Sequence, residues 1–424
     1  MRLKLTLTAL AAAMSFGAVP VHAQTIEEMR LEMKKLREEL NELKKAKAAE
    51  AKPADASGWG ERIEALEIKS KDALVVGDIG GGFRIPGSET SLHIYGYAEA
   101  HAIHDFKQSG APDIFTDLTF QPLNNAGGLT GRTKFTAETS RFGFETSTPT
   151  SLGTFNTKVE ADFYSYGADD NRNRLRLRHA YGEYGGWLIG QTWSTFMDLD
   201  DLPETVDFNG PIGAPFSRRT MVRYTYGDAK AGYKLSFAAE DPEDQFGGGS
   251  ANERMPQLVA RFDKSFDWGA VNLRGLAHEK RSATQTKYGL GVGVGGSFKL
   301  TDKDVFMGQY TYVEGDIDQL YGSNGYAIDA TTGAITFDHN QGLVLGYART
   351  FSDQLRGSFV LGFNRGKTAQ AVDNKTLGQL FVNLIYSPIK NVELGGEFIY
   401  GQRKTFAGDT GTLSRFDLMG RYSF

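Results

Sequence analysis

The chain has 424 residues, of which 51 are glycine, 12% are aromatic and none is cysteine. Without cysteine it has no disulfide, no thiolate metal site and no thiol nucleophile. Its formal net charge of −5 gives no basic excess that could neutralise phosphates, so we expect no nucleic-acid partner.

The first 23 residues are typical of a secretory signal peptide. Arg2 and Lys4 precede the apolar run LTALAAAMSFGAV, and Val21-His22-Ala23 has small or modest residues where signal peptidase cuts. Cleavage after Ala23 is expected to give a mature chain that begins at Gln24 and has a net charge of about −7. No later stretch reaches the roughly 18 apolar residues of a membrane helix. We therefore expect the mature chain either in the periplasm or as a closed barrel in a membrane.

Residues 24–47 are predicted to form a periplasmic coiled coil. Their apolar residues are spaced 3, 4, 3, 4 and 3 apart, the a/d pattern, and charges at flanking positions would pair across a parallel seam. A single amphipathic helix lying on its own protein is the alternative. Three heptads are marginal alone in water, so attachment to an oligomer would help them. The predicted oligomerisation residues are Ile26, Met29, Met33, Leu36, Leu40 and Leu43.

A linker with a short helical segment is expected over residues 48–87, and a β-domain over residues 88–424. Segments of about 8–16 residues in the β-domain alternate apolar with polar side chains, between turns and polar loops. In the second segment Phe135 and Phe142 have opposite parities, which predicts a bulge or a change of face. The sixteen predicted strands are 90–106, 133–146, 154–166, 173–185, 187–194, 218–227, 230–240, 255–266, 269–281, 285–300, 303–315, 340–351, 354–366, 374–387, 391–403 and 412–424.

This pattern favours a wide membrane barrel over a soluble sandwich. A sandwich needs two apolar inner faces, whereas here the face opposite the apolar one carries charge and glycine, and mean hydropathy is only −0.37. The final RFDLMGRYSF alternates and ends on Phe424, which resembles the assembly signal of bacterial outer-membrane barrels; an ordinary edge strand is the alternative. The predicted fold class is all-β, a 16-stranded antiparallel transmembrane β-barrel with an N-terminal α-helical coiled-coil segment.

The stretch NRNRLRLRHAY predicts a strand with arginine on one face and leucine on the other. For one strand alone, the solvated face of an ordinary sheet would explain it. In a barrel, Arg174, Arg176 and Arg178 would face a wet lumen. By the same alternation His179 is expected outside, at a subunit interface or in the interfacial belt, because a lipid-exposed imidazole is costly.

A segment of about 24 residues without alternation, about 194–217, separates the fifth and sixth strands, and a loop of this length is usually functional or disordered. In sixteen-stranded porins the outer loop after strand five folds inward and narrows the channel, and this resemblance implies an inward-folded constriction loop here. The loop is acidic, and Arg219 and Arg223 follow it on one face of the sixth strand. We expect the arginines to form a wall facing the acidic loop, with a transverse field that favours anions. The predicted solute path comprises Arg174, Arg176, Arg178, Arg219, Arg223, Arg141, Lys158, Asp198, Asp200, Asp201, Glu204 and Asp207.

The sequence resembles the DcaP-like outer-membrane porins. The resemblance rests on a signal peptide followed by a coiled coil, and on the stretches GGFRIPGSETSLHIYGYAEAHAIHDF, TSRFGFETSTPTSLGTFNTKVEADFY, LRLRHAYGEYGGWLIGQTWSTFMD and RFDLMGRYSF. It implies a trimeric sixteen-stranded channel with a periplasmic coiled coil and a preference for small anionic solutes. Arg174, Arg176 and Arg178 correspond to the wall motif, and WSTFMD leads into the constriction loop.

The expected function is that of an outer-membrane porin, a passive diffusion channel for small hydrophilic solutes with a preference for anions such as small (di)carboxylates. We expect a homotrimer in the outer membrane of a Gram-negative bacterium, in contact with lipid and lipopolysaccharide. One alternative is a structural anchor whose coiled coil reaches into the periplasm or to peptidoglycan.

A barrel enzyme is the remote alternative. His93 and His101 share a face with Tyr95, Tyr97 and Glu99, but no GxSxG motif or metal-spaced histidine pair accompanies them. We therefore expect no catalytic residue, no metal and no cofactor.

Overall fold

The computed structural model describes residues 75–107, 118–125, 130–164, 175–243, 253–367 and 373–424, together with residues 34, 35, 38, 39, 41, 42 and 45. The predicted signal peptide, the six residues of the coiled-coil seam and Arg174 lie outside the described residues. The chain divides into two units, Met1–Val76 with Arg84–Ser88, and Gly77–Phe83 with Glu89–Phe424. In the described part of the chain, no helix is long and apolar enough to cross a membrane.

In the first unit, the described residues between Lys34 and Lys45 are helical. Two exposed ion pairs lie along this helix, Lys34 with Glu38 at 3.9 Å and Lys45 with Glu42 at 3.2 Å. Exposed pairs of this kind stabilise a helix only slightly. The coiled coil itself stays a prediction.

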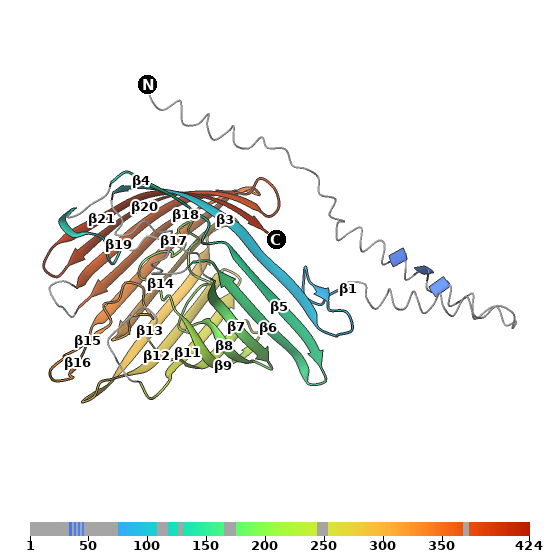
Figure 1. Cartoon of the computed structure of the whole chain (residues 1–424), viewed down its shortest axis with the longest axis horizontal. Coiled ribbons are helices and arrows are strands. Elements are labelled where there is room, and N and C mark those ends of the chain that lie inside the picture. Colours follow the sequence, from blue (N-terminus) through green and yellow to red (C-terminus); the bar gives the residue numbers. More distant parts are fainter. Residues whose placement is uncertain are drawn as a thin grey trace, which may run out of the picture. The chain divides into compact units, whose positions relative to one another are not determined.

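The second unit is a closed antiparallel barrel (Figure 1). β4 and β5 both pair with β3 as two halves of one strand, so the ring has sixteen strands, and β21 pairs with β3 to close it. The strands of the ring are β3 (Ser91–Lys107), β4 (Arg132–Thr136), β5 (Arg141–Thr150), β6 (Gly153–Asp162), β7 (Arg176–Tyr184), β8 (Trp187–Trp193), β9 (Arg218–Asp228), β10 (Tyr233–Glu240), β11 (Gln257–Phe266), β12 (Gly269–Arg281), β13 (Thr286–Lys299), β14 (Asp304–Glu314), β17 (His339–Ser352), β18 (Leu355–Gly366), β19 (Asn374–Tyr386), β20 (Val392–Thr405) and β21 (Thr410–Ser423).

Several short elements accompany the ring. They are β1 (Val75–Val76), β2 (Phe83–Arg84), the 3-10 turn η1 (Leu123–Asn125) and the hairpin of β15 (Tyr326–Ile328) and β16 (Ile335–Phe337). Connections between barrel strands are short at one end of the ring and long at the other. We call these the short-turn end and the long-loop end.

The sixteen predicted strands coincide with the sixteen strands of the ring, which confirms the all-β barrel. The predicted irregularity of the second strand is the break between β4 and β5, where the Ser140 backbone N–H donates to the Ala137 carbonyl at 3.1 Å. Phe135 and Phe142, on either side of it, are 78% and 41% exposed. The break shifts the alternation by one residue, so that the phenyl groups of both residues face the outer surface.

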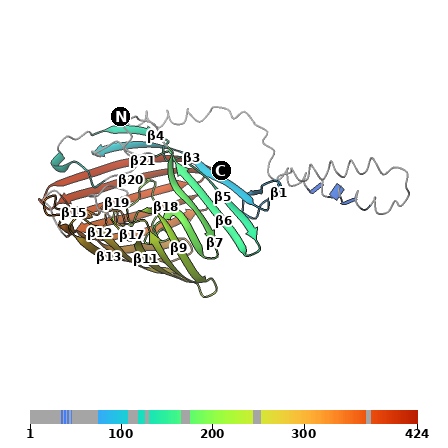
Figure 2. The same ribbon diagram turned by 60° about the horizontal axis from the view of Figure 1, so that its bottom comes forward.

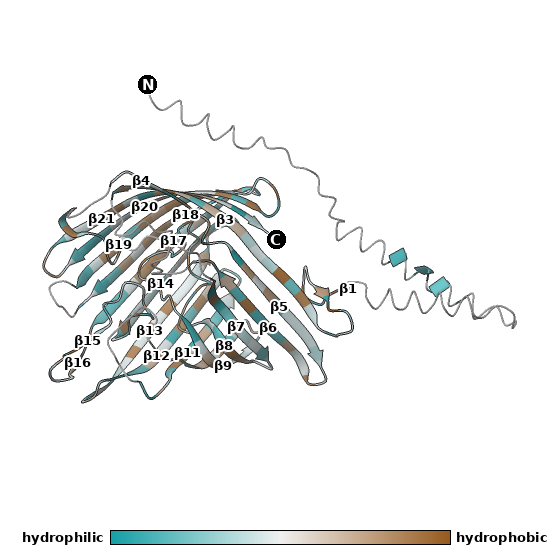
Figure 3. Cartoon of the chain, viewed as in Figure 1, coloured by the Kyte–Doolittle hydropathy of each residue, from teal (hydrophilic) through white to brown (hydrophobic). Residues whose placement is uncertain are grey.

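The outer surface of the ring is apolar. Along β17 and β18 the outward pairs are Leu343 with Phe363 and Leu345 with Leu361, and these side chains are exposed. Hydrophobic and hydrophilic residues alternate along the strands (Figure 3). Such a band can face hydrocarbon, while each strand's backbone groups are paired with its neighbours.

The interior of the barrel contains apolar clusters as well as charged residues. Inward residues such as Val360 and Phe381 are fully buried, because Leu118, Ile212 and Ala214 from the long-loop connections pack on them. Strands β17–β21, which carry much of this cluster, occupy a different part of the ring from β5–β9 (Figures 1 and 2). Apolar packing therefore fills part of the interior of the barrel.

Candidate solute path

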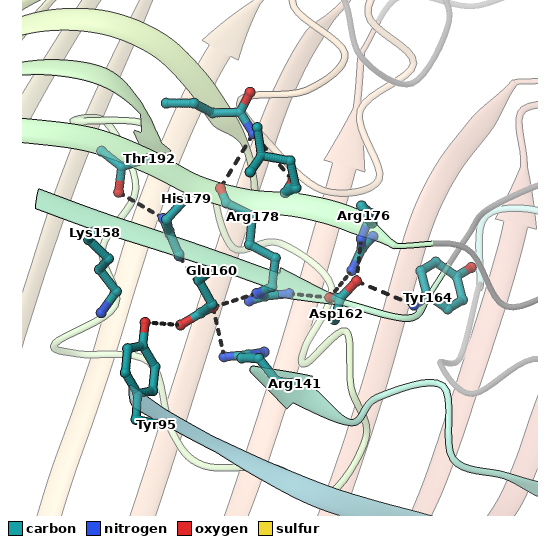
Figure 4. A network of polar contacts seen from close by, with 12 residues as sticks. Tyr95, Arg141, Lys158, Glu160, Asp162, Tyr164, Arg176, Arg178, His179 and Thr192 are labelled. Carbon is teal, nitrogen blue, oxygen red and sulfur yellow. Dashed lines mark hydrogen bonds and ion pairs between the residues drawn. The ribbon is translucent and has the colours of Figure 1, made fainter. Parts of the chain in front are cut away.

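Arg176 and Arg178 project inward from β7 and are bound by carboxylates of the neighbouring β6 (Figure 4). Asp162 accepts two hydrogen bonds from Arg176, at 2.9 and 2.7 Å, and one from Arg178 at 2.8 Å. Glu160 accepts a bond from Arg178 Nε at 2.8 Å and lies 3.4 Å from Arg141 of β5. We call Arg141, Arg176 and Arg178, with these two carboxylates, the arginine wall.

Aromatic rings cover the arginine wall. The guanidinium of Arg176 lies 4.8 Å from the ring centroid of Tyr164 and 5.7 Å from that of Phe208. Arg178 lies 5.9 Å from the same Phe208 ring and 5.7 Å from Trp193. Such contacts attract a cation to the face of the ring. Since Phe208 belongs to the loop 194–217, this loop meets the arginine wall through a ring.

A bulge in β7 sets the orientation of the wall. Leu177 pairs with Ala161 and His179 with Glu160, so Arg178 is the extra residue between them. Arg178 and His179 therefore both turn inward, and His179 is only 7% exposed. The prediction that His179 faces outward is wrong, because an extra residue shifts the strict alternation by one position.

The loop 194–217 packs against inward residues of the barrel strands, and we call it the inward loop. Its first carboxylates attach it to β11 and β12. Asp198 accepts a hydrogen bond from Asn272 at 2.6 Å and lies 3.4 Å from Arg261 and 3.8 Å from Arg274. Asp201 accepts a second bond from the same amide at 2.8 Å.

The remaining loop carboxylates continue this attachment around the ring. Asp200 lies 3.4 Å from Arg261, and Glu204 binds Arg356 of β18. Asp207 accepts the backbone N–H groups of the second and third residues after it, at 3.0 and 3.2 Å. The two backbone N–H groups before Phe208 donate to the buried Glu397 carboxylate, at 2.9 and 2.8 Å.

The carboxylates that bind Arg176 and Arg178 thus come from β6, whereas those of the inward loop bind other strands. Sequence analysis missed Glu160 and Asp162 as partners. The signal was their position, since both occupy the polar face of TFNTKVEADFYSY with Lys158, which pairs with Glu145 at 2.7 Å.

Arg219 and Arg223 have the same parity on β9, but their surroundings differ. Arg219 is 1% exposed and donates to Ser217 Oγ at 2.9 Å, to Asp318 Oδ2 at 2.9 Å and to two backbone carbonyls after β10. Arg223 is half-buried and borders a cavity. Of the two, only Arg223 is placed to meet a solute there.

A second loop, residues 315–325, also folds inward and was not foreseen from the sequence. Gln319 donates to Ser194 Oγ at 3.1 Å and to Gln257 Oε1 at 2.9 Å. The fully buried Leu320 belongs to the same apolar cluster as Phe196 of the inward loop. This second inward loop therefore holds the first part of the inward loop in place.

A cavity of about 1140 Å³ lies on the inner side of β6–β12, between the start of the inward loop and the short-turn end. Its charged lining residues include Glu183, Asp200, Arg223, Lys234, Arg261 and Asp263. A cavity of this size, with charged residues in its lining, has room for water and small solutes.

The two inward histidines of β3, His93 and His101, lie beside carboxylates. His101 is buried with Nδ1 3.0 Å from Asp417 and Nε2 3.1 Å from Glu99, while His93 lies 4.0 Å from Glu145. No group of three or more histidine or carboxylate side chains is placed to hold a metal in the described ranges.

Comparisons with known proteins agree with this architecture. The outer membrane channel DcaP of Acinetobacter baumannii, a crystal structure, is 31% identical, with a TM-score of 0.73, over 81% of this chain and 99% of that chain. OmpT, an outer membrane protein of Vibrio cholerae, is 12% identical with a TM-score of 0.53 over 79% and 98% of the two chains, and shares the fold.

Among curated proteins, porin Omp2b of Brucella suis biovar 1 (strain 1330) is 26% identical over 207 residues, which are 45% of this chain. The match spans 52% of that relative's length. The family model described as DcaP outer membrane protein matches residues 82–424, from the start of the barrel to the last residue. This chain belongs to the DcaP outer membrane protein family.

Proposed function

We propose that this chain is a passive channel for small hydrophilic solutes, with a preference for anions such as small (di)carboxylates. The channel function is supported by its family and by the polar cavity inside the ring. The anion preference rests on one observation, an excess of guanidinium over carboxylate at the arginine wall. Three arginines contact Glu160 and Asp162. Arg218 adds a further cation beside them, since it lies 4.6 Å from the ring of Trp193 that Arg178 also contacts.

The chemistry of guanidinium suits this role. It stays charged at physiological pH and can hold a carboxylate with two parallel hydrogen bonds. The Arg176 side chain is 29% exposed, so part of its fork is open to water although Asp162 occupies the rest. Water and salt screen the remaining charge, with a Debye length of about 8 Å. Binding is then weak enough for solutes to leave again.

Reversal potential in a potassium chloride gradient tests the anion preference. Arg176→Ser is expected to shift it toward cation preference and to slow the uptake of small carboxylates, with folding unchanged. Arg178→Ser is expected to act in the same direction but to cost stability as well, because it leaves two buried carboxylates without this partner. Unchanged selectivity together with a lost fold would show that the arginines hold the wall together and select nothing. A purified protein that passes no ions would favour the structural anchor.

We also propose a homotrimer, as the porin neighbours are typically trimeric. Polar side chains on the outer face of β3–β6 support a contact surface there. Thr146 and Thr157 are 2.6 Å apart, and His104 Nδ1 lies 2.9 Å from the Thr133 hydroxyl. Polar groups are costly against lipid, and a neighbouring subunit would remove that cost. Contacts of the N-terminal segment with peptidoglycan, and of the barrel with lipopolysaccharide, stay predictions.

A further inference from the structure

The geometry points to a second anion-binding site, separate from the arginine wall. It lies on the inner face of β9 and β10, in the cavity near the short-turn end, and consists of Arg223, Thr225, Lys234 and Ser236. The inference rests on the proposed channel function and names a further place where small carboxylates bind.

Arg223 supplies the main charge of this site. Within the part of the chain that the structure describes, its guanidinium makes no hydrogen bond or ion pair, unlike those of Arg176 and Arg178. Glu183 lies in the cross-strand row of Arg223, on the far side of Leu188. Two strand spacings separate the backbones of Arg223 and Glu183 by roughly 10 Å. Glu183 and Glu240 both attract the charge of Arg223 without forming an ion pair with it. The fork of Arg223 is therefore available to a solute.

Hydroxyl groups and a second cation extend the site. Thr225 and Ser236 face each other across β9 and β10, with their hydroxyl oxygens 3.0 Å apart. Lys234 lies one step further, opposite Gly227 of β9 and Asp263 of β11, and is exposed. The cross-strand pair that contains Arg223 and the pair that contains Lys234 lie four residues apart along β9 and β10, a distance of roughly 14 Å. A carboxylate can bind at the guanidinium with hydroxyl donors beside it, and the ammonium attracts a second negative charge.

Several acids border the same cavity, and most of them have partners of their own. Asp201 accepts a hydrogen bond from Asn272 at 2.8 Å, and Asp228 accepts two backbone N–H groups of its own turn, at 2.8 and 3.1 Å. Asp200 and Asp263 also border the cavity, but both contact Arg261, at 3.4 and 2.6 Å. Their negative charge is therefore balanced in part by a cation that belongs to neither site. Lys264, the remaining cation of the lining, donates to the Ala231 carbonyl. Among the described residues that line the cavity, Arg223 and Lys234 are therefore the cations without a hydrogen bond or ion pair.

The two anion sites lie in series along the barrel. Arg223 is five residues from Arg218 on β9, which places it roughly 17 Å nearer the short-turn end. Trp193 contacts Arg178 and Arg218 and also borders the cavity, so it lies at the boundary between the sites. In outer-membrane barrels short turns face the periplasm. A solute that leaves the arginine wall would pass Trp193 and bind at Arg223 before it is released.

Sided block of the chloride current tests the second site. The full-length mature protein is placed in planar bilayers, and malonate is titrated on one side at a time. Arg223→Gln is expected to raise the apparent Kd for block from the short-turn side about fourfold, the factor that one charge gives at roughly 5 Å in water. Arg176→Gln should act mainly on block from the other side. Lys303→Gln removes an exposed charge at the short-turn end, outside the cavity, and should change neither.

Arg223→Lys separates charge from geometry. It keeps the cation but loses the fork, so block by malonate should weaken by a smaller factor than in Arg223→Gln. Unit conductance and heat-modifiable gel mobility test whether each variant is folded. If Arg223→Gln does not fold, the comparison of Arg223→Lys with the wild type decides whether the second site exists. Block as strong as in the wild type in these variants, or an equal change in Lys303→Gln, would overturn the site. A wild-type protein without conductance, or with cation preference, would overturn the channel proposal instead.

Discussion

Glu204 in the inward loop and Arg356 on β18 form a two-pronged ion pair. Arg356 Nε and one terminal nitrogen donate to the two carboxylate oxygens at 2.8 and 2.9 Å, and the same terminal nitrogen donates to Glu393 of β20 at 2.6 Å. The planar fork of arginine makes such a pair directional as well as attractive. The middle of the inward loop is therefore held by charge to β18, through an arginine that also binds β20.

Replacing Glu204 with glutamine should loosen the middle of the inward loop. The pair is partly exposed, so its loss should cost about 1 kcal/mol at most, which leaves the barrel folded. We expect greater noise in the open-channel current of single channels. Asp353→Asn, which removes a carboxylate from an exposed turn, serves as the control. Equal noise in Glu204→Gln and wild type would show that other contacts hold the loop.

Gly295 of β13 is expected to be required for seating the inward loop. A Cβ added there would lie 2.0 Å from Asp198 Oδ2 and 2.7 Å from Asn272 Nδ2. Gly295→Ala should therefore displace the first part of the loop, and limited proteolysis within residues 194–202 should become faster. Gly275→Ala on the adjacent β12 is a matched control, since nothing lies within 4 Å of its added Cβ. Faster cleavage in both variants, or in neither, would contradict this role.

Attachment of the inward loop should depend on pH through Asp201. Burial, and then the neighbouring Asp198, raise the pKa of the Asp201 carboxyl from 3.8 to about 6. A carboxyl whose pKa is raised by folding destabilises the folded state when it ionises, so attachment should weaken between about pH 4 and pH 6 and stay weaker above. Hydrogen exchange of the amides of residues 198–202, corrected for intrinsic rates, should be slower at pH 5 than at pH 7.5. Asp201→Asn should lose this dependence; the same midpoint in that variant would assign it to another group.

The N-terminal segment should matter for assembly and not for conduction. Deleting residues 24–47 from the mature chain removes the predicted seam, so trimers should be less abundant or less stable in mild detergent. The barrel closes through β3 and β21, and its unit conductance should therefore be unchanged. Mass measurement of the intact complex and single-channel recording give the two readouts. A wild-type monomer in mild detergent would refute the trimer.

Alternation along the sequence was sufficient to predict the sixteen strands and the irregularity within the second strand. The two faces of a strand follow from backbone geometry with a period of two residues, so Phe135 and Phe142 alone indicated an irregularity between them. The missing alternation over residues 194–217 indicated a long loop for the same reason, whereas its inward fold was expected only from the resemblance to sixteen-stranded porins. These are local properties that neighbouring residues in the chain determine.

The partners inside the barrel were decided only by the tertiary structure. Arg178 binds Glu160 and Asp162 because the register of β6 and β7 places them together, and one bulged residue turns His179 inward. The second inward loop reaches the first through contacts such as Gln319 with Ser194, 125 positions apart. Cross-strand register and loop packing depend on residues far apart in sequence, which no periodicity records. The sequence by itself therefore determined which faces are polar and apolar, whereas folding determined which charges are paired and left Arg223 open to the cavity.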